Sequence, residues 1–115
     1  MSRVDLRSDT LTLPTDEMRE AMAAAEVGDD VYGEDPTVHR LEEIAAEQVG
    51  MEAALYVPSG AMGNTCAMLS HARHGEEVIF EERAHMLVWE CGAFANIAGL
   101  ASRTLTGPNG IIQPD

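Results

Sequence analysis

Short apolar segments alternate with helix-length segments through the second half of the chain, and this alternation constrains the fold more than any other feature. Three runs have the length and apolar content of buried strands: residues 52–57, 77–81 and 100–105. The two segments between them, 61–72 and 86–98, carry mostly apolar side chains, so both are expected to be interior helices. The order strand, helix, strand, helix, strand predicts an α/β fold, with a mostly parallel sheet and flanking helices.

The first 50 residues predict an arm followed by two helices. Residues 1–14 are rich in Thr and Ser and are expected to form an extended N-terminal arm. In the first helix Thr15 is a typical N-cap residue. Met18 and Met22 belong to an apolar stripe at helical spacing, which predicts a core position for both and argues against a catalytic role.

The second helix has recognisable signals at both ends. Asp35 is an N-cap candidate, Pro36 suits the first helical position, and Gly50 is expected to end the helix. Residues 15–50 therefore hold two helices and, between them, a Gly- and Asp-rich loop that carries Tyr32. The remaining residues, 51–115, read as the start of an α/β domain. Three parallel strands would leave long edges and an uncovered face, so we expect the whole chain to be a single, incomplete domain.

The charge balance narrows the range of partners. The chain has 20 acidic residues and 7 arginines, with a net charge of −13 and no lysine. Nothing here neutralises a phosphate backbone, which argues against nucleic-acid binding, and the missing lysine excludes a Walker A loop. Acids dispersed along the chain, with arginine replacing lysine, suggest adaptation to a high-salt cytoplasm. An ordinary acidic surface of a soluble enzyme explains the same composition.

Other sequence features predict a cytoplasmic protein with no membrane association. No apolar run reaches the length of a membrane span, and the first seven residues are charged where a signal peptide would be apolar. Cys66 and Cys91 have no metal-binding spacing and fit a reducing compartment as small buried residues. His71 and His74 lie three residues apart on a predicted helix, but no further ligands accompany them, so helix-end histidines are favoured and no metal site is expected.

A Pro-Ser-Gly turn connects the first predicted strand to the helix that follows it. Pro58, Ser59 and Gly60 would leave backbone N–H groups unpaired at the positive end of the helix dipole. Phosphate groups bind well at such a helix start, and glycine lets them approach the backbone. The spacing is not that of a dinucleotide fingerprint. On local pattern alone, a turn without any ligand explains the segment equally well.

Four motifs follow one another along the chain: residues 5–10 (DLRSDT), residues 28–36 (GDDVYGEDP), residues 58–64 (PSGAMGN) and His85. Together they resemble the N-terminal part of the threonine aldolase family. This family belongs to the β-eliminating lyase group of pyridoxal-phosphate enzymes, which have the aspartate-aminotransferase fold (fold type I). The resemblance extends over essentially the whole chain. It implies that the chain forms the N-terminal part of the large, cofactor-binding domain of such an enzyme.

The resemblance also implies roles for individual residues around the cofactor. The N–H groups of Gly60, Ala61 and Met62 would hold the phosphate of pyridoxal 5′-phosphate (PLP). Family members usually carry threonine where this chain has Ala61, so one hydroxyl donor is lost and weaker cofactor binding is expected. His85 would stack on the pyridine ring near the substrate hydroxyl, where an imidazole can accept a proton. Without the family context, His85 reads as a surface loop residue.

Two further residues acquire substrate-binding roles from the same resemblance. Ser8 would contact the substrate carboxylate, although a local turn beside Asp9 explains it nearly as well. Tyr32 lies in a loop that is expected to reach the active site of a neighbouring subunit, because family members are homo-oligomers, commonly tetramers. The substrate class implied is a small β-hydroxy-α-amino acid.

The implied reaction is cleavage of threonine or allo-threonine to glycine and acetaldehyde. The family's covalent lysine, the aspartate at the pyridine nitrogen and the arginine for the substrate carboxylate are all expected beyond Asp115. The 115 residues alone are therefore expected to be inactive, as a fragment of such an enzyme. Two alternatives stay open: an inactive or split chain that binds phosphate or associates with a partner chain, and a different PLP-dependent β-eliminating lyase.

Overall fold

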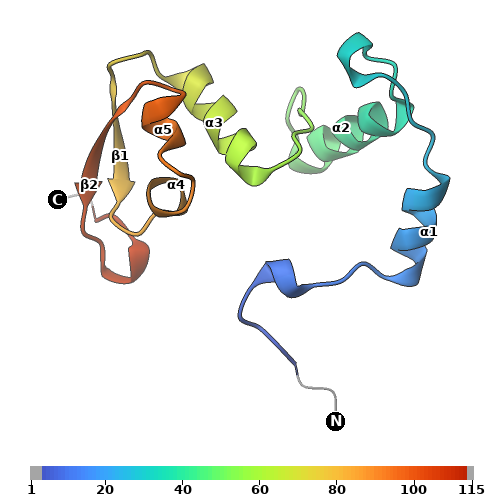
Figure 1. The fold of residues 1–115 in the computed structure, drawn as a ribbon, viewed down its shortest axis with the longest axis horizontal. Helices are drawn as coiled ribbons and strands as arrows, with labels where there is room; N and C mark the ends of the chain where they lie inside the picture. Colours follow the sequence, from blue (N-terminus) through green and yellow to red (C-terminus); the bar gives the residue numbers. More distant parts are fainter. Residues whose placement is uncertain (1–3, 114–115) are drawn as a thin grey trace. The chain divides into compact units, whose positions relative to one another are not determined.

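The computed structural model describes residues 4–113, which divide after Tyr56 into two compact units (Figure 1). The first unit holds two α-helices and two short 3₁₀ turns. In chain order they are η1 (Asp9–Leu11), α1 (Asp16–Ala24), η2 (Asp30–Tyr32) and α2 (Pro36–Val49). No helix among these residues, or elsewhere in 4–113, combines the length and apolar character that crossing a bilayer requires.

The helix ends of the first unit confirm the predicted caps. The Thr15 hydroxyl accepts a hydrogen bond from the N–H of Met18 (3.2 Å), and α2 ends at Gly50 in the left-handed conformation. The expectation that the apolar stripe of α1 lies in a core is wrong for this unit: Met18 is 58% exposed and Met22 63%. A stripe shows which helix face is apolar. Burial also needs a second element packed against that face, and α1 buries no residue.

The loop between α1 and α2 is closed by the carboxylate of Asp35, which is only 8% exposed. One oxygen accepts the N–H of Gly28 (3.0 Å), and the other accepts those of Thr37 and Val38 (3.0 and 2.9 Å). A side chain at Gly28 would collide with the carbonyl of Glu34, because its Cβ would lie 2.1 Å from that oxygen. The loop is therefore a tight structure, and Tyr32 lies within it as the last residue of η2.

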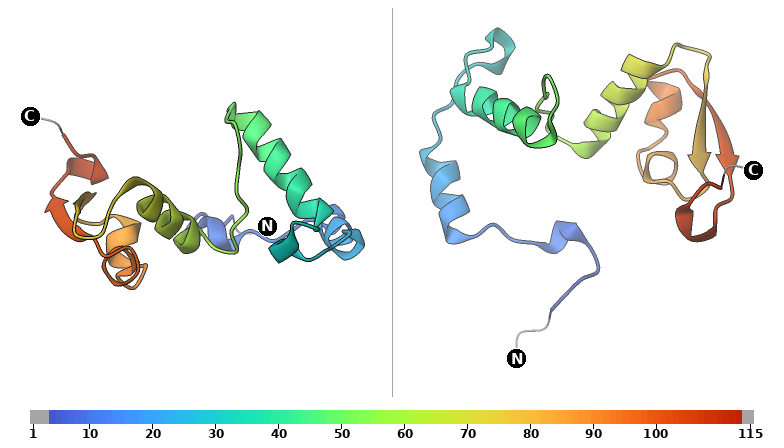
Figure 2. Two further views of the ribbon diagram at one scale, coloured as in Figure 1. Left: turned by 90° about the horizontal axis from the view of Figure 1, so that it is seen from above. Right: turned by 180° about the vertical axis from the view of Figure 1, so that it is seen from behind.

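The second unit is a small α/β structure around a two-stranded parallel sheet (Figures 1 and 2). Strand β1 (Glu77–Glu81) pairs with β2 (Ala101–Leu105) over their whole length, and Ile79 lies opposite Arg103 in the register. Met68, Phe80, Ala98 and Leu100 form the buried core, and Phe94 packs edge-on against Phe80. The elements are α3 (Gly60–His71), β1 (Glu77–Glu81), α4 (His85–Val88), α5 (Ala93–Asn96), β2 (Ala101–Leu105) and η3 (Pro108–Gly110).

The α/β class and the parallel pairing are confirmed, but the sheet is smaller than predicted. Residues 52–57 form no strand; the N–H of Tyr56 instead donates to the side chain of Glu42 (2.7 Å). A short apolar run becomes a strand only where a neighbouring edge completes its hydrogen bonds, and the described residues offer this run no such edge. Helix α3 was expected in the interior, yet only Thr65 and Met68 are buried in it.

The single helix predicted over 86–98 is also wrong. Two four-residue helices, α4 and α5, occupy this segment, and His85 begins the first of them. The chain turns between them at Cys91 and Gly92, which both adopt the left-handed conformation (φ 53° and 72°). Trp89 lies at this break and is 71% exposed, where a buried position was expected. Apolar content indicated helix and burial, but periodicity does not detect a two-residue reversal.

His74 has a packing role in the second unit. Gly99 adopts a positive φ of 66°, and a Cβ at this position would lie 2.1 Å from the imidazole ring of His74. The N–H of Gly75 donates to the carbonyl of Gly99 (2.8 Å), which joins the end of α3 to the segment before β2. The ring therefore fills the space that a side chain at residue 99 would need.

Candidate active site

The start of α3 presents two backbone donors to open space. Ser59 is the N-cap, and its hydroxyl accepts the N–H of Met62 (3.2 Å). The N–H groups of Gly60 and Ala61 have no acceptor within residues 4–113. A Cβ on Gly60 would meet no atom within 4 Å. Two free donors at the positive end of a 12-residue helix favour an anion such as a phosphate group.

A buried carboxylate connects this helix to His85. One turn into α3, the side-chain amide of Asn64 donates to Glu90 Oε1 (2.6 Å). The same oxygen lies 3.0 Å from Nδ1 of His85, at the start of α4. The sequence indicated the Pro-Ser-Gly motif and His85 separately. In the structure Glu90 lies between them and connects them.

The side chains of Glu90 and His85 differ sharply in exposure. The Glu90 side chain is 2% exposed, while that of His85 is 72% exposed. Glu90 Oε2 is buried and has no hydrogen-bond partner among the described residues. A buried carboxylate is costly unless hydrogen bonds compensate it, so the contacts to Asn64 and His85 matter for the local stability. The exposed imidazole is anchored at one nitrogen and accessible at the other.

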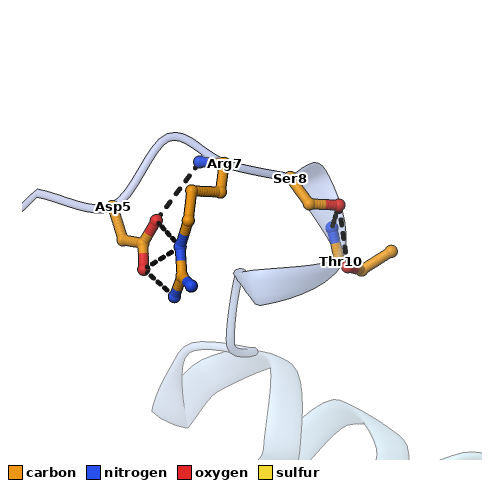
Figure 3. A network of polar contacts seen from close by, with 4 residues as sticks. All are labelled: Asp5, Arg7, Ser8 and Thr10. Carbon is orange, nitrogen blue, oxygen red and sulfur yellow. Dashed lines mark hydrogen bonds and ion pairs between the residues drawn. The ribbon is translucent and has the colours of Figure 1, made fainter.

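The remaining predicted site residues, Ser8 and Tyr32, lie in the first unit and are held by near neighbours in the sequence. Ser8 caps η1: its hydroxyl accepts the N–H of Thr10 (3.2 Å) and lies 2.8 Å from the Thr10 hydroxyl (Figure 3). Beside it, the guanidinium of Arg7 holds the pKa of Asp5 below its ordinary value by hydrogen bonding. Tyr32 is 77% exposed at the end of η2.

Glu90 is the site residue that sequence reasoning missed. It is an acidic residue in a segment, 86–98, that is otherwise almost entirely apolar. A lone carboxylate in a segment expected to be buried needs a polar partner, and this was the signal that could have identified it. Asn64 belonged to the recognised Pro-Ser-Gly motif, but its sequence position did not indicate which side chain it contacts.

Comparison with known proteins identifies the family of this chain. The sequence model of the family named Beta-eliminating lyase matches residues 5–115. The chain belongs to this family. Every residue of the Asn64–Glu90–His85 network, and the start of α3, lies inside the matched region.

The curated relatives within this family include several threonine aldolases. The chain is 53% identical over 106 residues to low-specificity L-threonine aldolase 1 of Arabidopsis thaliana, which covers 91% of this chain and 30% of that protein. It is 50% identical over 97 residues to the low specificity L-threonine aldolase of Escherichia coli K12, covering 84% of this chain and 29% of that protein. For the Saccharomyces cerevisiae enzyme of the same name the identity is 42% over 92 residues, with coverages of 79% and 24%. The chain thus spans less than a third of the length of these β-eliminating lyase relatives.

Proposed function

We propose that this chain is the N-terminal part of a PLP-dependent aldehyde-lyase that cleaves threonine or allo-threonine to glycine and acetaldehyde. The observation that supports it best is the Asn64–Glu90–His85 network, which links the free N–H groups at the start of α3 to an exposed imidazole. A phosphate-binding element and a candidate base are thereby held by one buried carboxylate. The likeness to low-specificity threonine aldolases supports the choice of substrate.

The residues at the start of α3 fit the phosphate of PLP. Gly60 and Ala61 offer free N–H donors, and Met62 would add a third if Ser59 released it. Open space at Gly60 leaves room for a phosphate close to the backbone. Ala61 supplies no hydroxyl, so the backbone N–H groups and the helix dipole would account for the affinity. When bound, PLP supplies an electron sink for the electron pair left on Cα as the Cα–Cβ bond breaks.

His85 would act on both the ring and the substrate in this proposal. The face of its imidazole would lie against the pyridine ring, and its accessible nitrogen would accept the proton of the β-hydroxyl group. Loss of that proton lets the Cβ–O bond become the carbonyl of acetaldehyde as the Cα–Cβ bond breaks. The Ser8 hydroxyl would donate to the substrate carboxylate. Tyr32 would reach the active site of a neighbouring subunit in a homo-oligomer, a tetramer by family resemblance.

The proposal also needs a residue that this chain does not contain. The 115 residues include no lysine, so the covalent bond to PLP has to be made by a lysine outside them. We infer accordingly that residues 1–115 belong to one larger domain of fold type I. The same absence favours the second candidate, an inactive chain that binds phosphate or pairs with a partner polypeptide. A cytoplasmic location and adaptation to high salt remain predictions from composition.

Aldehyde release by the full-length protein tests the function directly. With PLP and threonine or allo-threonine we expect equimolar glycine and acetaldehyde, measured by coupled reduction of the aldehyde. Ammonia release from cysteine or tryptophan, with no aldehyde from threonine, would indicate a different β-eliminating lyase. The intact mass of the protein from its native cell separates the other alternative: a mass of 12.4 kDa would contradict catalysis and favour a chain that acts with a partner.

Gly60→Ala tests the cofactor site separately. The added methyl group meets no protein atom, so the free energy of unfolding should change by less than about 0.5 kcal/mol. It would occupy space next to the proposed phosphate, and we expect the Kd for PLP, followed by its absorbance, to rise about tenfold or more. The control is Gly99→Ala, which clashes with His74 and should lower stability while the PLP affinity of the folded protein is kept. An unchanged Kd in Gly60→Ala would place the phosphate elsewhere.

A further inference from the structure

We propose that Glu90 is a positioning residue that fixes the neutral imidazole of His85 in one tautomer, with the proton on Nδ1 and the free electron pair on Nε2. The use of Nε2 as the base in aldol cleavage rests on the proposed function. The tautomer itself rests on the geometry around Glu90 and can be measured without substrate or cofactor.

The assignment follows from what each atom can donate. Asn64 reaches Glu90 through its amide nitrogen, so Glu90 Oε1 is the acceptor in that bond (2.6 Å). The same Oε1 faces Nδ1 of His85 at 3.0 Å. An Oε1 that carries no proton can only accept, so its contact with Nδ1 requires hydrogen on Nδ1, and this holds whether or not Oε2 carries a proton. Since a neutral imidazole has only one N–H, Nε2 is left as the acceptor on the exposed side of the ring.

Glu90 is held firmly enough to impose this choice. Its side chain is 2% exposed, and it is fixed from α3 by Asn64. The backbone on its other side turns sharply, because Cys91 and Gly92 are both left-handed. A left-handed residue other than glycine is uncommon and costs free energy, and such positions persist where the surrounding structure requires them. The reversal between α4 and α5 keeps Glu90 beneath the imidazole instead of extending the helix away from it.

The proposed arrangement has a clear consequence for proton transfer. With Nδ1–H bound to a carboxylate, Nε2 can take a proton from a substrate hydroxyl without a prior change of tautomer. A carboxylate at Nδ1 also stabilises the positive charge that the ring then acquires. Without Glu90, a ring with its proton on Nε2 would present a donor where an acceptor is needed.

The first experiment is a long-range ¹H–¹⁵N NMR spectrum of the full-length protein, free of PLP and labelled with ¹⁵N-histidine. It is recorded at a pH at which the ring is neutral, and the His85 signals are assigned by their loss in His85→Asn. We expect the nitrogen shifts of a ring protonated at Nδ1. A ring protonated at Nε2 in the unmodified protein would overturn the proposal outright, with no variant required.

Variants test whether Glu90 is the cause. Glu90→Leu removes the acceptor and should convert His85 to the Nε2–H form that an unconstrained imidazole prefers. Glu90→Gln keeps a carbonyl acceptor and should restore part of the original tautomer. The matched control is Glu81→Gln, which alters another buried carboxylate, one that contacts Arg83 and not His85. An Nδ1–H signal that survives in folded Glu90→Leu would contradict the assignment.

Kinetics connects the tautomer to the proposed function. In the PLP-loaded protein we expect Glu90→Leu to lower kcat for threonine cleavage about 10²-fold with little change in KM, and Glu90→Gln to recover part of it. If the unmodified protein shows the Nδ1–H tautomer but releases no aldehyde, the proposed function fails and the positioning role of Glu90 stands. If it releases aldehyde but shows the Nε2–H tautomer, the function stands and the positioning role fails.

Discussion

In the first unit the predicted site residues are held by neighbours within three positions in the sequence: Ser8 by Thr10, and Tyr32 by the carbonyl of Asp29. In the second unit His85 depends on Glu90, which in turn is fixed by Asn64, 26 residues earlier in the chain. Both units thus present exposed polar side chains that the family resemblance marks as functional. Only in the second unit is such a side chain supported by a buried group, which is itself fixed by a residue far away in the sequence.

This difference predicts how each unit responds to substitution. A local turn contact exchanges readily with water, so its loss costs little. A buried carboxylate that loses a donor has no water to replace it, and the cost reaches the rest of the network. Substitutions around Glu90 should therefore affect stability and chemistry together, whereas those at Ser8 should affect substrate binding alone.

The largest effect is expected for His85→Asn. If His85 is the base for the β-hydroxyl proton, kcat for threonine cleavage by the full-length protein should fall about 10²–10⁴-fold, measured by acetaldehyde release. His39→Asn is the control, since His39 is an exposed residue of α2 in the first unit. An unchanged kcat in His85→Asn would show that His85 does not take the β-hydroxyl proton.

Asn64→Ala should give the next largest effect. It removes the donor from α3 to the buried Glu90, and we expect the free energy of unfolding to fall by about 1–3 kcal/mol. The matched control is Asn96→Ala, which breaks an exposed 3.3 Å bond to the carbonyl of Cys91 and should cost less than about 0.5 kcal/mol. The free energy of unfolding is measured by urea denaturation. If Asn64→Ala and Asn96→Ala lose equal amounts of it, the buried network is no stronger than a surface contact.

The same distinction between local and distant contacts explains what could be predicted from the sequence. Caps are local: Thr15, Asp35 and Gly50 were recognised because a cap depends on residues within one turn. Strands β1 and β2 and their parallel pairing also followed from apolar runs separated by helix-length segments.

What the sequence did not reveal depends on distant or unusual backbone geometry. The run at 52–57 has strand composition but no neighbouring edge, so composition alone predicted the wrong structure. The reversal at Cys91 and Gly92 needs a non-glycine residue at positive φ, which no periodicity indicates. Glu90 could be recognised as unusual in an apolar segment, but its partners, Asn64 and His85, follow only from the fold.

A smaller effect is expected for Ser8→Ala, and it tests the locally held unit. If the Ser8 hydroxyl donates to the substrate carboxylate, KM for threonine should rise about tenfold with kcat little changed. The free energy of unfolding should stay within about 0.5 kcal/mol, since Ser8 bonds only to exposed neighbours. Thr12→Ala removes a comparable hydroxyl contact in the same turn, to the carbonyl of Asp9, and should leave KM unchanged. If KM is similar in Ser8→Ala and Thr12→Ala, the role of Ser8 is purely structural.

The smallest effect concerns Asp35, a buried residue of the first unit whose carboxylate links positions seven apart. The N–H groups of Val38 and then Gly28 donate to its carboxylate and lower its pKa in the folded state. Its stabilising contribution is therefore present above the unfolded pKa of about 3.9 and is lost as the pH falls through the lower, folded value.

We expect the amide proton shifts of Gly28 and Val38 to titrate together with a midpoint below 3.9. Asp35→Asn should abolish this titration, and Thr15→Ala, a cap without an ionisable group, should leave it intact. Separate midpoints for the two amides would mean that Asp35 caps α2 without closing the loop. The contacts between distant residues that remain in the first unit, such as those of Thr37 with Glu26 and of Tyr56 with Glu42, are exposed, in contrast with the buried network around Glu90.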